Sequence, residues 1–73
     1  MKWTHNAPRV KGWFWIRSDD ERTEVVEVKE TIYGGDLRLC VMIPGRSGLI
    51  EATPADSGWD ASVQFAGPVP EPS

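Results

Sequence analysis

The sequence has few of the residues on which disulfide-bonded and metal-binding proteins depend. Its 73 residues include one cysteine, Cys40, and one histidine, His5. A single cysteine cannot form an internal disulfide, and small secreted domains usually carry several, so we expect an intracellular, cytoplasmic protein. One cysteine and one histidine also fall short of the four ligands of a tetrahedral zinc site. We therefore expect no metal ion and no cofactor.

The sequence also lacks a surplus of basic residues and any long apolar run. Acidic residues outnumber basic ones by 11 to 8, which gives a net charge of −3. Proteins that bind nucleic acids normally show the opposite balance, because neutralising phosphates supplies much of their affinity. No stretch approaches the ~18 apolar residues of a membrane-spanning helix. The expected partner is therefore neither a nucleic acid nor a membrane.

Aromatic residues, in contrast, are abundant for so short a chain, which has four tryptophans. Each indole side chain buries roughly 150–250 Å² when it packs, whereas a domain near this size buries only about 60% of its unfolded surface. Residues 12–17, Gly-Trp-Phe-Trp-Ile-Arg, predict a β-strand with Trp13 and Trp15 on one face and Phe14 and Ile16 on the other. A sheet this small can hardly enclose both faces, so we expect one of them to meet a partner.

The first half of the chain predicts three strands. After the strand over 12–17, residues 23–33 alternate around Val26 and Val28, a pattern typical of a β-strand. Gly34-Gly35 then predicts a tight hairpin turn before a strand over 37–43. The row of that strand that we expect in the core consists of Leu37, Leu39, Val41 and Ile43.

The second half predicts shorter elements. They are a returning strand over 49–52, a single helical turn over 53–56 and a last strand over 59–65. The predicted fold class is therefore all-β, a single antiparallel meander of four to five strands curled into an SH3-like barrel. Its parts are an N-terminal arm (1–11), a β domain (12–66) and a proline-rich C-terminal tail (67–73).

Residues with catalytic chemistry occur, but not in catalytic combinations. His5 lies in the arm with no carboxylate beside it in the sequence, and Cys40 lies within a strand, where we expect a buried thiol. The carboxylates Asp19, Asp20 and Glu21 share a polar turn, whereas general acid chemistry needs carboxyl groups in contrasting surroundings. We therefore expect no enzymatic activity.

The residues with the character of a binding site are aromatic and charged. Tryptophan and arginine are enriched in interface hot spots, and acidic side chains steer a basic partner. The predicted partner-binding residues are Trp13, Trp15, Arg17, Asp19, Asp20, Glu21 and Trp59. Three alternatives stay open: burial of the tryptophans in the core, a small self-assembling structural protein or homodimer, and a binder of single-stranded nucleic acid or a small ligand through exposed tryptophans.

Three segments together resemble small uncharacterised proteins of phages and prophages. They are Pro8-x-x-x-Gly12-Trp13-Phe14-Trp15-x-Arg17, Glu24-Val25-Val26-Glu27-Val28 and Phe65-Ala66-Gly67-Pro68-Val69-x-x-Pro72. The chain departs from that pattern at Phe65, where a tryptophan is expected. The resemblance assigns no activity to any residue. It implies an accessory protein in the cytoplasm of a bacterium or a phage-infected cell. The predicted function is a non-catalytic module that binds and modulates a host protein, a defence machine among the candidates.

Overall fold

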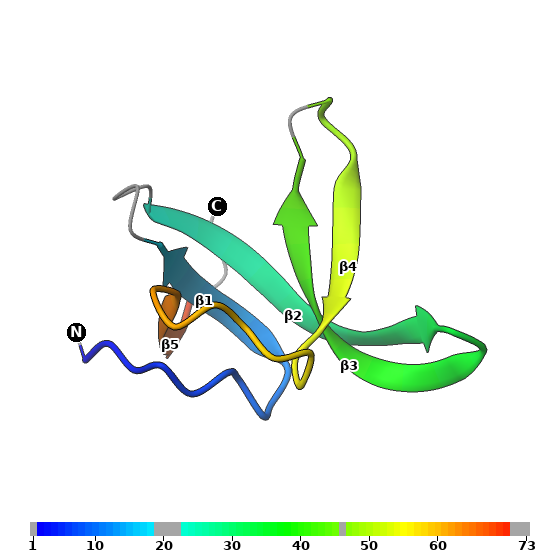
Figure 1. Ribbon diagram of the computed structural model, residues 1–73, viewed down its shortest axis with the longest axis horizontal. Coiled ribbons are helices and arrows are strands. Elements are labelled where there is room, and N and C mark those ends of the chain that lie inside the picture. Colours follow the sequence, from blue (N-terminus) through cyan, green and yellow to red (C-terminus); the bar gives the residue numbers. More distant parts are fainter. Residues whose placement is uncertain (1, 19–22, 46, 71–73) are drawn as a thin grey trace.

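The computed structural model describes residues 2–18, 23–45 and 47–70 (Figure 1). These residues form five strands in one antiparallel sheet of order β4-β3-β2-β1-β5, which leaves β4 and β5 at the two edges. The all-β prediction is confirmed. The strands are β1 (Gly12–Arg17), β2 (Thr23–Tyr33), β3 (Asp36–Pro44), β4 (Ile50–Pro54) and β5 (Gln64–Val69). None of the described residues belongs to a helix with the length and apolarity needed to cross a lipid bilayer.

The hairpin between β2 and β3 forms where the paired glycines predict it. Tyr33 pairs with Asp36, so Gly34 and Gly35 alone make the loop. Their φ angles are 62° and 89°. A two-residue hairpin loop with positive φ at both positions favours glycine, because a side chain is strained there. The local signal was therefore sufficient to predict the turn.

The helical turn predicted over 53–56 is wrong at its start, although a hydrogen-bonded turn follows, in which the N–H of Ser57 donates to the carbonyl of Pro54 over 3.1 Å. Thr53 and Pro54 belong to β4, where they pair with Val41 and Cys40 of β3. The backbone N–H of Ala55 extends this ladder by donating to the carbonyl of Leu39 over 2.9 Å. Pro54 fits an edge strand because its missing N–H costs no ladder bond when it faces away from the neighbouring strand.

The last strand also differs from the prediction, which placed it over 59–65. In the structure Trp59 and Val63 lie in the connection from β4, which Figure 1 shows returning past β1 to β5. Asp60 organises this connection, because its Oδ1 accepts hydrogen bonds from the N–H and the hydroxyl of Ser62, both over 2.9 Å. These bonds lower the pKa of the Asp60 carboxyl. Such local bonds offer the backbone an alternative to a strand ladder.

Strand β5 instead runs from Gln64 to Val69 and takes in residues that were expected in the tail. Its outer edge is partly occupied by the N-terminal arm. Thr4 and Phe65 exchange two backbone hydrogen bonds, of 2.9 and 2.7 Å. The arm is therefore docked onto the sheet through Thr4.

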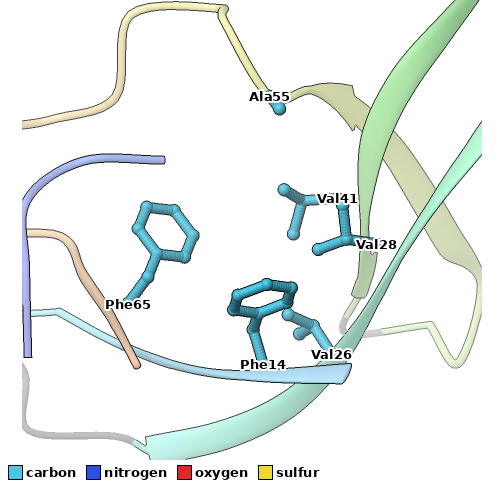
Figure 2. Close-up of a cluster of buried hydrophobic side chains, with 6 residues drawn as sticks. All are labelled: Phe14, Val26, Val28, Val41, Ala55 and Phe65. Atoms are coloured by element: carbon cyan, nitrogen blue, oxygen red, sulfur yellow. The ribbon is translucent and has the colours of Figure 1, made fainter. Parts of the chain in front are cut away.

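The core lies on one face of the sheet, between the strands and the β4–β5 connection. Figure 2 shows the side chains converging from four strands and from the start of that connection. Val63 and Trp59 of the connection and Ala7 of the arm pack against the same cluster. The buried cluster consists of Phe14, Val26, Val28, Val41, Ala55 and Phe65.

The predicted core row of β3 is only partly buried. Val41 is fully buried and Leu39 and Ile43 are half-buried, but Leu37 is 62% exposed. The prediction that Leu37 lies in the core is therefore wrong. The reason is that β1 ends its pairing with β2 at Val28, and β4 ends its pairing with β3 at Cys40. The hairpin tip extends beyond both neighbours, as Figure 1 shows.

Cys40 is fully buried, as predicted, and its thiol therefore reports on folding. A buried thiol reacts only through opening of the structure, because the reagent must reach the thiolate. We expect the native chain to react with an aromatic disulfide reagent at least about a hundredfold more slowly than the chain in urea. The absorbance of the released thiolate measures both rates. Equal rates would contradict the burial of Cys40.

Candidate functional site

The second face of the sheet carries two of the four tryptophans. Partners directly opposite each other in an antiparallel pair share a face. Trp13 pairs with Glu27 and Trp15 pairs with Val25, so these side chains lie together, opposite to Phe14. We call this surface the tryptophan face. It includes Trp13, Trp15, Arg17, Thr23, Val25, Glu27, Met42, Ala52, Gln64, Ala66 and Val69.

The register joins residues of all five strands across this face. One continuous row runs from Ala52 through Met42, Glu27 and Trp13 to Val69. Most residues of the tryptophan face are half-buried, but Thr23 is exposed and Ala66 is buried. The cluster on the opposite face is buried throughout. The arm and the connection contribute Ala7, Trp59 and Val63 to that opposite face. The tryptophan face is therefore a broad, partly exposed surface that combines apolar side chains with a few charges.

Arg17 stands at one end of the tryptophan face in a fixed position. Its guanidinium carbon lies 4.1 Å from the ring centroid of Trp3, a cation–π contact. Its Nε donates a hydrogen bond of 2.9 Å to Oε1 of Gln64 on β5. The backbone pairing of Thr4 with Phe65 holds Trp3 in place, because Trp3 is the preceding residue. Arg17 is thus held by a ring on one side and by an amide on another.

The structure brings three of the predicted site residues together and separates a fourth from them. Trp13, Trp15 and Arg17 share the tryptophan face. Trp59 packs against the core instead: its ring meets Phe65 edge-on at 5.3 Å, and its Nε1 donates to the carbonyl of Ala55 over 2.9 Å. The other three predicted site residues, Asp19, Asp20 and Glu21, lie outside the described residues.

Sequence reasoning did not include Trp3 and Gln64 in the site. Trp3 is separated from Arg17 by 14 positions, and Gln64 by 47. Both reach Arg17 only through pairing between distant parts of the chain, of β1 with β5 and of Thr4 with Phe65. The only signal for Trp3 was that it is the one large apolar side chain in the first six residues after Met1.

The remaining polar side chains of interest are already engaged. His5 lies with Nδ1 3.1 Å from the carbonyl oxygen of Val63. Arg38 and Asp56 form an ion pair of 2.7 Å beside an open groove that the arm and the β4–β5 connection border. Because these two charges satisfy each other, the groove offers a ligand fewer unpaired charged groups than the tryptophan face does.

No protein-family model, curated protein or solved structure matches the chain.

Proposed function

We propose that this chain is a non-catalytic protein-interaction module and that its partner binds the tryptophan face. The observation that carries the proposal is the half-buried state of Trp13 and Trp15 on the face opposite the core. Covering such rings removes apolar area from water, at about 25 cal/mol per Å². Tryptophans near the centre of a binding surface are also the residues that most often dominate its affinity.

The setting of the proposal follows from the resemblance to phage and prophage proteins. The partner is then a host protein, the site of action is the cytoplasm, and the module modulates that protein, with defence machinery as one candidate. An SH3-like barrel remains part of the proposal. The strand order, with β5 beside β1 and β4 at the opposite edge, supports it. An additional contact between the edge strands β4 and β5 would be needed to close the sheet into a barrel.

The test is differential capture from a bacterial lysate. We expect the wild-type chain to capture a protein that the double variant Trp13→Thr, Trp15→Thr binds at least about 30-fold more weakly, since hot-spot residues contribute about 2 kcal/mol or more each. Threonine is chosen because it keeps the strand propensity. Quantitative mass spectrometry of the captured fraction, followed by titration of the purified partner, measures the effect.

A matched control replaces exposed apolar side chains elsewhere. Ile32 and Leu37 form a cross-strand pair at the hairpin tip and are 66% and 62% exposed. The double variant Ile32→Thr, Leu37→Thr should capture the partner as the wild type does. Loss of capture in this control together with retention in the tryptophan variant would move the binding surface to the hairpin tip and refute the proposal.

The same variants decide between a foreign partner and a second copy of the chain. The edge strand β4 is five residues long and carries Glu51 and Pro54, and the other edge strand, β5, is partly occupied by the arm through Thr4. Short edge strands with a charge and a proline are protected against pairing with another sheet. We therefore expect light scattering to give a monomer at high micromolar concentration. A dimer that the tryptophan variant dissociates would assign the face to self-assembly instead.

A further inference from the structure

The starting observation is that Arg17 is fixed in place but not neutralised. Its Nε is used by Gln64 and one face of its guanidinium by Trp3. Among the residues that the structure describes, no carboxylate lies within 4.0 Å of it. Among these residues, the two terminal amino groups of the guanidinium therefore have no carboxylate as a hydrogen-bond acceptor.

Three other basic side chains, on β2, on β3 and just before β1, differ from Arg17 in this respect. Lys29 lies 4.0 Å from Glu27, and Lys11 lies 3.6 Å from Glu30. Arg38 is paired with Asp56 at 2.7 Å. Within the described part of the tryptophan face, Arg17 is therefore the cation that lacks an acidic partner. The charge complementary to it is a single anion.

We propose that Arg17 binds a side-chain carboxylate of an extended partner segment, whose neighbouring apolar side chains lie on Trp15 and Trp13. This inference rests on the proposed function, because it assumes that the tryptophan face binds a protein. A guanidinium fork matches the two oxygens of a carboxylate. A fork whose orientation is already fixed loses less side-chain entropy on binding than a mobile one.

The spacing along β1 defines the sequence pattern of the segment. Successive side chains on one face of a strand are about 7 Å apart, so Arg17, Trp15 and Trp13 follow each other at that interval. An extended peptide has the same repeat. An acidic residue on Arg17 therefore places every second residue of the peptide over a tryptophan. The expected motif is acidic-x-apolar-x-apolar, read in either chain direction.

Two related ligands fit the site less well. Non-specific nucleic-acid binding requires several neutralised phosphates. The described residues of this face include one cation without an acidic partner, on a chain of net charge −3. A C-terminal carboxylate is normally held by a cluster of backbone N–H groups rather than by one arginine fork. The overall negative charge also opposes a run of acidic residues. The segment that we infer carries one carboxylate.

The probe is the peptide Ser-Leu-Thr-Leu-Thr-Glu-Thr-Leu-Thr-Leu-Ser, acetylated and amidated so that glutamate holds its only carboxylate. Its symmetric sequence presents the motif in both directions. The comparison peptide carries glutamine in place of glutamate. We expect wild-type protein to bind the glutamate peptide at least about tenfold more tightly, the usual effect of a hydrogen bond to a charged group. Tryptophan emission follows the titration, since neither peptide contains tryptophan.

Variants then assign the preference to Arg17. Arg17→Gln should bind both peptides equally, at the affinity that the wild type has for the glutamine peptide. Trp3→Leu should lower the preference part of the way, because Arg17 keeps its bond to Gln64 but loses the ring that orients it. Arg38→Gln, which removes an arginine already paired with Asp56, should keep the full preference. Slow reaction of Cys40 establishes that each variant is folded.

The outcomes separate this inference from the proposed function. Equal binding of the two peptides by the wild type, or no binding of either, overturns the inference. If capture from lysate still depends on Trp13 and Trp15, the proposed function stands without it. If capture does not depend on them either, both fail. Binding of a 12-nucleotide oligothymidylate at low salt, tighter than that of the glutamate peptide and lost in Arg17→Gln, would overturn the inference in favour of a nucleic acid.

Discussion

Replacing Phe65 with alanine is expected to remove most of the stability of the chain. Phe65 is 1% exposed, and its ring contacts Trp59 edge-on at a centroid distance of 5.3 Å. Removing a buried phenyl ring costs about 3–5 kcal/mol. A 73-residue protein has roughly 4–11 kcal/mol in total, and small domains lie at the lower end. The urea midpoint, followed by tryptophan emission, should therefore fall close to zero denaturant.

The position of Phe65 explains why one side chain has so large an effect. It lies in β5, where it pairs with Ile16 of β1 on one side and with Thr4 of the arm on the other. Its ring reaches the β4–β5 connection through Trp59. Phe65 thus joins the sheet, the arm and the connection, and its loss leaves a cavity where three segments meet.

The matched control is Leu49→Ala, which also removes a large apolar side chain. Leu49 is 71% exposed, so its loss should change the free energy of unfolding by no more than about 0.5 kcal/mol. The rate at which Cys40 is labelled without urea gives a second, independent measurement for both variants. Similar midpoints for the two variants would show that Phe65 does not hold the core together.

Local patterns in the sequence predict the first three strands because those patterns act between near neighbours. Alternation alone separates Phe14 from Trp13 and Trp15, and the structure confirms that they lie on opposite faces; which face is the core, namely that of Phe14, could not be read from the alternation. The paired glycines determine the hairpin in the same way, since their positive φ angles are a property of the turn itself. Neither inference required knowledge of a distant strand.

The prediction fails where pairing between distant segments decides the structure. Residues 59–65 alternate as a strand does, yet Asp60 and Ser62 bond to each other and form part of a turn. Gly67 and Pro68 look like a tail but become strand, because β1 offers them a free edge. Both outcomes depend on where the chain has already placed β1.

How deeply a side chain is buried also depends on segments that are distant in the sequence. Leu37 and Val41 occupy equivalent positions in one apolar row, but only Val41 lies within reach of β1 and β4. The candidate site likewise combines residues that the local sequence groups with residues that only distant pairing brings in. Trp13, Trp15 and Arg17 belong to one strand and could be grouped from sequence, whereas Trp3 and Gln64 join them through pairings that span most of the chain.

A second large effect is expected for Gly67→Ala, and it arises from a bulge in β5. Trp13 pairs with Val69 and Trp15 pairs with Ala66, so Gly67 and Pro68 both lie opposite the single residue Phe14. A β-carbon on Gly67 would lie 2.9 Å from the Phe14 ring and 3.2 Å from the carbonyl oxygen of Trp13. The backbone φ of 147° is itself strained for any residue with a side chain.

The variant Gly12→Ala tests the backbone strain of a positive φ without the steric clash of an added β-carbon. Gly12 has a φ of 146°, almost the same as that of Gly67, but its added β-carbon would meet nothing closer than 3.6 Å. The strain costs about 1–3 kcal/mol at either position, and overpacking adds about 1–3 kcal/mol at Gly67 alone. Urea titration should therefore place the midpoint of Gly67→Ala clearly below that of Gly12→Ala.

A double-mutant cycle tests the cause even though Gly67→Ala alone is expected to be close to unfolding. Phe14→Leu removes the ring that the new β-carbon would meet, so alanine at position 67 should cost less in that background than in the wild type. The difference, measured from urea midpoints in a stabilising concentration of sulfate, should lie between about 0.5 and 3 kcal/mol. Equal costs in the two backgrounds would mean that the Phe14 ring does not limit position 67, and that the backbone alone requires glycine there.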